Sequence, residues 1–326
     1  MTARVDALSR ALDARGDWLT TCSERGTDCV RLLHGAVEDA PGTAIDRYGD
    51  ILLVQTWREP LAAGELDALA AVVEERIGAL TPVWNNRRYG RRGGTRREFE
   101  LDHAVDLPDE LVGREEGLHF DVNPRHGGRD PLVFLDFRAG RRRVRAHSEG
   151  QSVLNLFSYT CTMGVAAAVG GATDVLNVDF ARSALDVGQR NAALNQVAMD
   201  ELQADCLPAM RLLAGLSAGG RRGKRGKLPK IEARTYDLVV LDPPRWARSS
   251  FGAVDVVRDY QSLFKPALLA TAPGGALLAT NNVASVSWED WVEQLLRCAT
   301  KAGRPLGSVE RVVVDPDFPS PDGQSP

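Results

Sequence analysis

Hydrophobic residues after Gln151 alternate between two spacings. Short apolar runs of strand length lie at 152–157, 174–178, 201–204, 236–241 and 276–280. Helical spacing separates or follows them at 163–169, 184–194, 263–271 and 288–301. Ser183 is placed to cap the helix that starts at 184, and Val309–Val314 is one more β-prone run. Alternation of this kind predicts an α/β fold, a doubly wound, Rossmann-like parallel sheet.

The residues before Gln151 follow a different pattern. Val5, Leu8 and Leu12 lie on one side of a helix predicted near the N-terminus. From Asp28, three apolar runs with turn residues between them predict a strand meander; they are 30–33, 43–45 and 51–55. A helical segment at 61–80 follows, then extended segments at 82–85, 116–122 and 132–136. The pattern therefore predicts an N-terminal helical segment (1–27), a small α+β domain (28–148) and a second α/β domain (149–326).

The distribution of charged residues along the chain adds information about a binding partner. The chain has 326 residues, enough for two domains, and a net charge of −4. Residues 87–97, 138–145 and 221–230 hold six, five and six basic residues and no acidic ones, which leaves 23 cations against 44 acids elsewhere. The last stretch lies in an insert, 215–235, that breaks the strand–helix alternation and predicts a basic loop. Such segregation predicts a surface that faces a polyanion. The candidate nucleic-acid-binding residues are Arg87, Arg88, Arg91, Arg92, Arg96, Arg97, Arg221, Arg222, Lys224 and Arg225.

Several classes of protein are disfavoured. No apolar stretch has the length of a membrane helix, and the N-terminus lacks the apolar core of a secretory signal. The five cysteines are scattered, with no C-x-x-C pair and no matching histidine cluster. We therefore expect a cytoplasmic protein without a disulfide framework or a metal site.

The first strand–helix turn of the second domain indicates what ligand the sheet binds. Residues 155–164, NLFSYTCTMG, contain one glycine, so the pyrophosphate fingerprint of dinucleotide-binding proteins is missing and a nicotinamide dehydrogenase is disfavoured. The second strand ends at Asp179, followed by Phe180. A carboxylate at that position can accept hydrogen bonds from both ribose hydroxyls, and the aromatic ring can pack on a purine.

Two later strand ends add to this set. Gln203-Ala-Asp205-Cys206 follows the third strand, where a side chain and an amide could recognise the edge of adenine. The fourth strand ends in Asp242-Pro243-Pro244-Arg245-Trp246. Two prolines stop the strand and hold a rigid turn, and the tryptophan offers a face on which a planar base can stack.

Together these motifs resemble class I S-adenosylmethionine-dependent methyltransferases, and more narrowly the 23S rRNA methyltransferases of the RlmI and RlmK type. The resemblance rests on NLFSYT, Asp179, QADC at 203–206 and DPPRW at 242–246, with FLDFR at 134–138 upstream. It implies an enzyme that uses S-adenosyl-L-methionine and acts on RNA.

The resemblance also implies roles for individual residues. Phe157, Ser158, Tyr159 and Thr160 would surround the methionine part of the cofactor. Asp179 would hold its ribose, while Phe180, Asp205 and Cys206 would border its adenine. Arg138 would close the pocket. Asp242, Pro243, Pro244 and Trp246 would face the target base and serve as the catalytic set.

Two departures from the family pattern refine the expectation. Cys161 stands where the family usually has glycine. The cysteine that the RlmI branch carries after the fifth strand is missing from Ala279-Thr280-Asn281-Asn282-Val283. Methylation of a pyrimidine carbon needs that nucleophile, so the sequence favours the RlmK branch and a guanine-type ring nitrogen in ribosomal RNA. Two alternatives stay open: a methyltransferase of proteins or small molecules, and a non-catalytic RNA-binding or assembly protein. The oligomeric state is not predicted.

Overall fold

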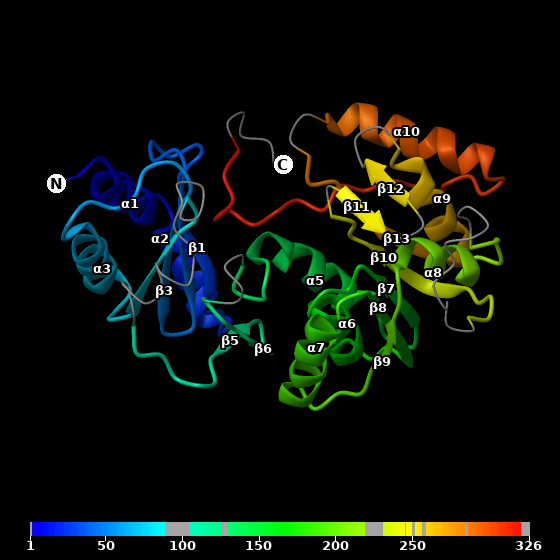
Figure 1. The fold of residues 1–326 in the computed structure, drawn as a ribbon, viewed down its shortest axis with the longest axis horizontal. Helices are drawn as coiled ribbons and strands as arrows, with labels where there is room; N and C mark the ends of the chain where they lie inside the picture. The colour runs from blue at the N-terminus through cyan, green and yellow to red at the C-terminus, as the bar shows by residue number, and fades with distance from the viewer. Residues whose placement is uncertain are drawn as a thin grey trace. The chain divides into compact units, whose positions relative to one another are not determined.

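The computed structural model describes residues 2–88, 105–125, 130–218, 231–244, 246–249, 252–255, 259–283 and 286–320. The chain forms two compact units (Figure 1). The first comprises Met1–Ala139 together with Val313–Pro326, and the second comprises Gly140–Val312. This division differs from the predicted domains, because it joins the helical N-terminus and the C-terminal segment to the small α+β domain.

The first unit is built on a four-stranded sheet of order β1-β2-β3-β4. Strands β1 and β2 pair with their neighbours antiparallel, whereas β3 and β4 run parallel and are connected through helix α3. Its elements are α1 (Ala3–Ala14), α2 (Gly16–Glu24), β1 (Cys29–His34), β2 (Thr43–Tyr48), β3 (Ile51–Thr56), α3 (Glu65–Arg76), β4 (Thr81–Asn86) and the hairpin β5 (Val112–Glu115) and β6 (Leu118–Asp121). The meander is as predicted, but residues 132–136 are not extended: a 3-10 turn spans Leu135–Phe137.

Helix α1 packs its apolar stripe on this sheet. Val5, Leu8 and Leu12 lie in one buried cluster with Ile45 and Leu52 of the strands. The helix begins at an N-cap, Thr2, whose hydroxyl accepts from the Val5 N–H and donates to the Glu65 carboxylate at 2.7 Å. The helical N-terminus is thus part of the core of the first unit.

The C-terminal segment is held in the first unit by buried charge. Arg138 is 1% exposed, and its guanidinium contacts the carboxylates of Asp315 and Asp317 at 3.0 Å and the Cys29 carbonyl at 2.7 Å. The strand predicted at 309–314 is wrong, since these residues have no regular structure. Asp315 and Asp317, which pair with Arg138, anchor the end of this segment. These tertiary contacts outweigh the β-propensity of the valines in the segment.

The second unit has a five-stranded parallel sheet of order β13-β10-β7-β8-β9 with helices between the strands. The α/β, Rossmann-like fold is therefore confirmed. Its elements are α5 (Arg138–Ala146, which starts in the first unit), β7 (Ser152–Leu156), α6 (Thr162–Val169), β8 (Asp174–Asp179), α7 (Arg182–Leu194), β9 (Asp200–Gln203), α8 (Cys206–Leu213), β10 (Tyr236–Leu241), the hairpin β11 (Trp246–Ser249) and β12 (Gly252–Asp255), α9 (Gln261–Ala270), β13 (Thr271–Ala279) and α10 (Trp288–Lys301).

The core of the second unit is largely apolar and contains a hydrogen-bonded asparagine pair. Leu154, Val239 and Leu263 belong to a large buried cluster, as expected for a sheet covered on both faces. Asn155 on β7 donates to the Asn177 carbonyl oxygen on β8 at 2.9 Å, and both side chains are buried. A side chain at Gly164 on α6 would lie 2.2 Å from that oxygen, so the helix packs on the pair only because residue 164 is glycine.

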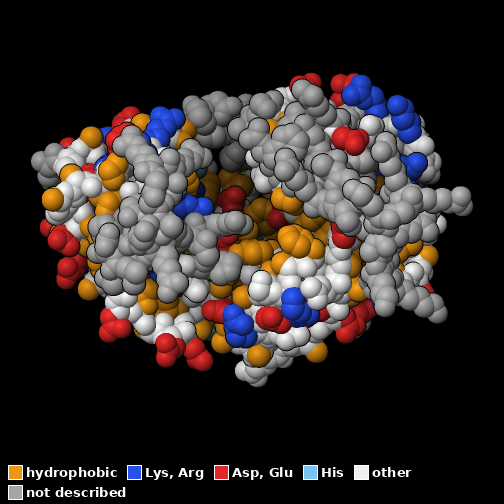
Figure 2. All heavy atoms as spheres, in the orientation of Figure 1, with side chains coloured by type: hydrophobic (Ala, Val, Ile, Leu, Met, Phe, Trp, Pro, Cys, Tyr) orange, Lys and Arg blue, Asp and Glu red, His pale blue; other side chains and the backbone are white. Residues whose placement is uncertain are grey.

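Charged side chains are unevenly spread over the surface. Figure 2 shows acidic side chains over the outer edge of the first unit, where α3 lies, and basic side chains over the C-terminal half of α10. Within the described ranges no helix is long and apolar enough to span a membrane, and no group of three or more histidine, cysteine or acidic side chains is placed to hold a metal ion.

Candidate functional site

The predicted site residues of the second unit lie at the carboxyl-terminal ends of its parallel strands, which we call the edge of the sheet. Strands β7, β8, β9 and β10 run parallel, so the residues after Leu156, Val178, Gln203 and Leu241 emerge at the same edge. The chain passes from β7 to β8 on one side, and β10 pairs with β7 on the other. The position where the strand order reverses is where ligands of open α/β sheets bind.

The loop between β7 and α6 has an unusual backbone. Phe157, Tyr159 and Cys161 adopt φ of 57°, 48° and 59°, the left-handed region that favours glycine. Each costs on the order of 1 kcal/mol for a residue with a side chain. Every second residue of the loop is thus strained, and the surrounding structure must supply the energy that holds it.

Three hydrogen bonds to strand β8 and helix α7 hold this loop. The Ser158 N–H donates to the Val178 carbonyl of β8 at 3.0 Å. The Tyr159 N–H donates to a carboxylate oxygen of Asp179 at 2.9 Å, and the Asn191 side chain of α7 donates to the Thr160 carbonyl at 2.9 Å. Hydrogen bonds within the chain therefore hold the predicted cofactor-binding loop in place.

Cys161 takes the place of glycine because α7 leaves room for it. Its thiol is buried, and a side chain at Gly188 would lie 2.5 Å from the sulfur. Burial raises the pKa of Cys161 to about 12, although a hydrogen bond with Ser158 opposes that shift. The thiol is thus a neutral packing group beneath the loop, and residue 188 compensates for its size.

Asp179 links the loop to the end of β8. One carboxylate oxygen accepts from Tyr159 and the other accepts from the Ala181 N–H at 2.9 Å. The helix α7 that follows begins at Arg182 with Ala181 at its N-cap, so the predicted cap at Ser183 is wrong. Each oxygen of an ionised carboxylate can accept a second hydrogen bond, which leaves capacity for ribose hydroxyls.

Two further predicted residues lie at the ends of neighbouring strands: Phe180 directly follows β8, and Asp205 lies two residues after β9. Phe180 is 71% exposed although it directly follows a buried strand. Asp205 caps α8 by accepting from the Leu207 N–H at 3.0 Å and stays partly exposed. Cys206 differs from the prediction, because its side chain is buried in the core and its thiol lies 3.3 Å from the Val178 carbonyl.

The fourth strand end is braced by two residues that the sequence did not single out. Thr280, just after β13, donates from its hydroxyl to the Asp242 carboxylate at 2.6 Å. Tyr260 is fully buried and donates to the Thr280 carbonyl at 2.8 Å. Burial raises the pKa of Tyr260, and the charge of Asp242 adds to the shift. Pro243 is buried and Pro244 exposed, so the rigid turn presents its second proline outward.

Some predicted residues are not part of this edge. The terminal nitrogens of Arg138 are bonded within the first unit, so we leave it out of the cofactor site. Arg87 and Arg88 follow β4 of the first unit. The side chain of Trp246, which opens β11, lies outside the described residues, as do Arg91, Arg92, Arg96, Arg97, Arg221, Arg222, Lys224 and Arg225.

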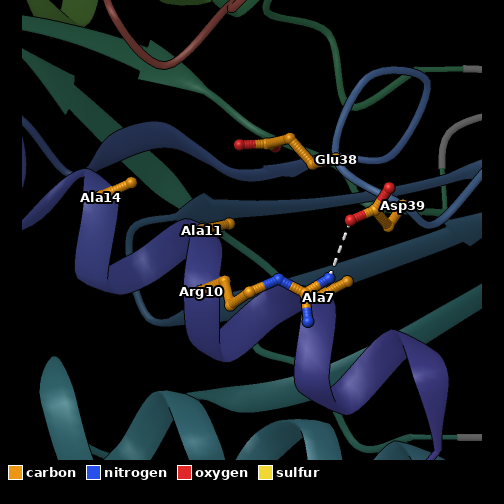
Figure 3. Close-up of a pocket in the computed structure, with 6 residues that line it drawn as sticks. All are labelled: Ala7, Arg10, Ala11, Ala14, Glu38 and Asp39. Atoms are coloured by element: carbon orange, nitrogen blue, oxygen red, sulfur yellow. Dashed lines mark hydrogen bonds and ion pairs between the residues drawn. The ribbon is translucent and has the colours of Figure 1, made fainter.

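A cavity of about 200 Å³ in the first unit does not belong to the predicted site (Figure 3). Small side chains of α1 line it together with Glu38 and Asp39 of the β1–β2 turn. Its charged groups already have partners: Arg10 pairs with Asp39 at 3.0 Å, and Glu38 pairs with Arg15 at 2.7 Å. We assign no ligand to it.

Comparison with known proteins agrees with the fold. A model of the S-adenosylmethionine-dependent methyltransferase family matches residues 30–325. A ribosomal RNA large subunit methyltransferase of Deinococcus radiodurans is 32% identical over 93% of this chain and 69% of its own length. The chain is also 27% identical to ribosomal RNA large subunit methyltransferase K/L of Alteromonas mediterranea, over 95% of this chain and 41% of that protein.

Solved structures share the fold. SMU.776, a methyltransferase solved as a complex with SAH, has a TM-score of 0.73 and 22% identity over 96% of this chain and 77% of its own. The chain belongs to the S-adenosylmethionine-dependent methyltransferase family.

The residues at the edge suit S-adenosylmethionine. A carboxylate with spare acceptor capacity, an exposed aromatic ring and a second carboxylate follow one another at the ends of β8 and β9. These are the groups that ribose hydroxyls, a purine face and an amino group require. Asp179, Phe180 and Asp205 would hold the nucleoside, and the loop 157–160 would hold the methionine part.

Proposed function

We propose that this protein methylates a base nitrogen, of guanine type, in ribosomal RNA. S-adenosylmethionine, when bound, supplies an electrophilic methyl carbon. The curated relatives that are named as ribosomal RNA large subunit methyltransferases support the substrate class. A cytoplasmic location is part of the proposal, because ribosomal RNA is modified there.

The placement of the cysteines is the observation that favours a ring nitrogen over a pyrimidine carbon as the methylated atom. A pyrimidine carbon must be activated by a cysteine nucleophile, and only the thiolate is nucleophilic. All five cysteines lie in described segments and all are buried. Burial raises the pKa of Cys22 to about 12 and also raises those of Cys161, Cys206 and Cys298. Strand β10 is followed by Asp242 and two prolines, and β13 by Thr280 and two asparagines, so no cysteine follows either strand directly.

A ring nitrogen needs less help from the protein. It already carries the lone pair that accepts a methyl group, so the enzyme has to position the base. Orientation alone can supply about 7–11 kcal/mol of the barrier. In this proposal the carbonyls of the Asp242–Pro244 turn accept from the base, Thr280 keeps the Asp242 carboxylate in place, and Trp246 stacks on the ring.

The substrate is best tested on whole ribosomal RNA. Mass spectrometry of nucleosides from cells with and without the gene should show the loss of one methylated guanine from large-subunit RNA. Return of that nucleoside with the wild-type gene is the control. Unchanged nucleosides, or the loss of a carbon-methylated pyrimidine, would contradict the proposal.

The role of Trp246 can be separated from cofactor binding. Trp246→Ala should reduce turnover on RNA far more than it reduces affinity for S-adenosylhomocysteine. Trp246→Phe keeps an aromatic face and should recover most of the turnover. Equal losses of turnover and cofactor affinity would argue against stacking.

A further inference from the structure

An exposed tryptophan and several arginines meet at one edge of the sheet in the first unit. Strands β3 and β4 run parallel, with Thr56 opposite Asn86, so the next residues, Trp57 and Arg87, leave the sheet side by side. Trp57 is 44% exposed. The Arg87 guanidinium lies over its ring, 5.9 Å from the centroid.

Hydrogen bonds to neighbouring residues hold Trp57 and Arg87 in place. The Arg87 N–H donates to the Thr56 carbonyl at 2.8 Å, and its guanidinium donates to the buried Gln55 side chain at 3.0 Å. The Trp57 N–H donates to the Gly42 carbonyl at 2.8 Å. The indole therefore has a defined position and still keeps nearly half its surface in water.

Further cations surround the pair. Arg88 follows Arg87, and Arg58 follows Trp57 with its side chain over Gly42. Arg125 donates to the Trp84 carbonyl and to the Asn85 side chain, both at 3.2 Å and both near the end of β4. The nearby acid is Glu59, 77% exposed and 3.2 Å from Arg88. The surface of Trp57, Arg58, Arg87, Arg88 and Arg125 is thus strongly basic.

We propose that this surface, which we call the Trp57 surface, binds a single-stranded segment of the RNA substrate, with an unpaired base stacked on Trp57 and the phosphates held by the arginines. An aromatic face among cations is the arrangement that single-stranded nucleic acids require, because every base has a face that can stack. Bases in a duplex are already stacked, so a duplex gains only the charge contacts. The inference rests on the proposed function and adds a second RNA contact outside the methyltransferase unit.

Binding of a fluorescent single-stranded RNA, and of the duplex of the same sequence, tests the inference over a range of salt concentrations. Trp57→Ala should weaken single-strand binding about fivefold to a hundredfold and leave the salt slope unchanged, since stacking involves no ion release. Trp57→Phe should recover most of the loss. Arg88→Ala should lower the salt slope by roughly one, whereas Arg10→Ala, which removes an exposed arginine elsewhere in the unit, should not.

Three results would overturn the inference. The first is a Trp57→Ala protein that binds single-stranded RNA as tightly as the wild type does. The second is a duplex that binds the wild type as tightly as the single strand and loses as much affinity in Trp57→Ala. The third is a polyglutamate peptide that binds equally well and is equally weakened, which would assign the surface to an acidic protein segment. Affinity for S-adenosylhomocysteine, measured in parallel, separates these failures from misfolding. If Trp57→Ala binds RNA normally and the wild type still methylates ribosomal RNA, the Trp57 surface is wrong but the proposed function stands.

Discussion

The two units bury charge for different reasons. In the first unit, Arg138 lies between the carboxylates of Asp315 and Asp317, with Glu115 at 3.9 Å, and all four side chains are at most 9% exposed. In the second unit the buried carboxylate of Asp179 lies at the C-terminal end of β8 and accepts from the backbone N–H groups of Tyr159 and Ala181. The charges around Arg138 therefore hold distant segments of the first unit together, whereas the Asp179 carboxylate holds a loop of the candidate site.

The largest effect is expected where the buried charge is structural. Arg138→Met should destabilise the protein by about 3–5 kcal/mol, because it leaves two buried carboxylates without a counter-charge. The free energy of urea unfolding measures this loss. Arg10→Ala, which breaks an exposed pair, should cost less than about 1 kcal/mol.

Adding Asp317→Asn to Arg138→Met sharpens the test. The double variant should regain part of the lost stability, since one unpaired charge is removed. An Arg138→Met protein that is fully stable but no longer binds the cofactor would contradict the structural role. It would show that Arg138 belongs to the cofactor site.

A smaller effect is expected beneath the strained loop. Gly188→Ala should destabilise the second unit by about 1–3 kcal/mol, because the new methyl group would lie 2.5 Å from the Cys161 sulfur. This cost exceeds the roughly 1 kcal/mol that alanine gains over glycine in a helix.

The double variant Cys161→Gly with Gly188→Ala isolates that contact. In the glycine background the new methyl group meets no sulfur, so the cost of Gly188→Ala should vanish or change sign. Additive unfolding energies for the two substitutions would show that α7 does not make room for Cys161.

The smallest effect is a pH dependence in the first unit. Burial lowers the pKa of His34 from its ordinary 6.5, and the charge of Arg31 lowers it further. The folded state thus binds the proton less well than the unfolded state does. The contribution of His34 to stability is full above about pH 6.5 and is lost as the pH drops through the lowered pKa. His34→Gln should remove that part of the slope of unfolding free energy against pH.

Sequence reasoning succeeded where structure is local. Strand β10 and helix α10 have the predicted bounds, because an apolar run of strand length and a helical spacing of apolar residues are visible within a few positions. Asp179 and Asp242 lie where the sequence placed them, at the end of β8 and directly after β10. Thr280 could not be found from the sequence, since its bond to Asp242 depends on the pairing of β13 with β10.

Contacts between residues far apart in the sequence could not be predicted. Arg138 lies 177 and 179 positions from its aspartate partners, so nothing near it in the sequence shows that its charge is already neutralised. The same aspartates draw 313–320 into the first unit and leave the predicted strand at 309–314 unformed. Propensity predicts a strand there, and tertiary pairing decides otherwise.

Calorimetric titration with S-adenosylhomocysteine tests the central claim, that the strand-end residues of the second unit hold the cofactor. The wild type and Arg138→Met, studied where the latter is folded, should bind with similar affinity. Asp179→Ala should bind at least about tenfold more weakly, the value of hydrogen bonds to a charged group. Equal affinity in Asp179→Ala and the wild type, or loss of binding only in Arg138→Met, would contradict the account.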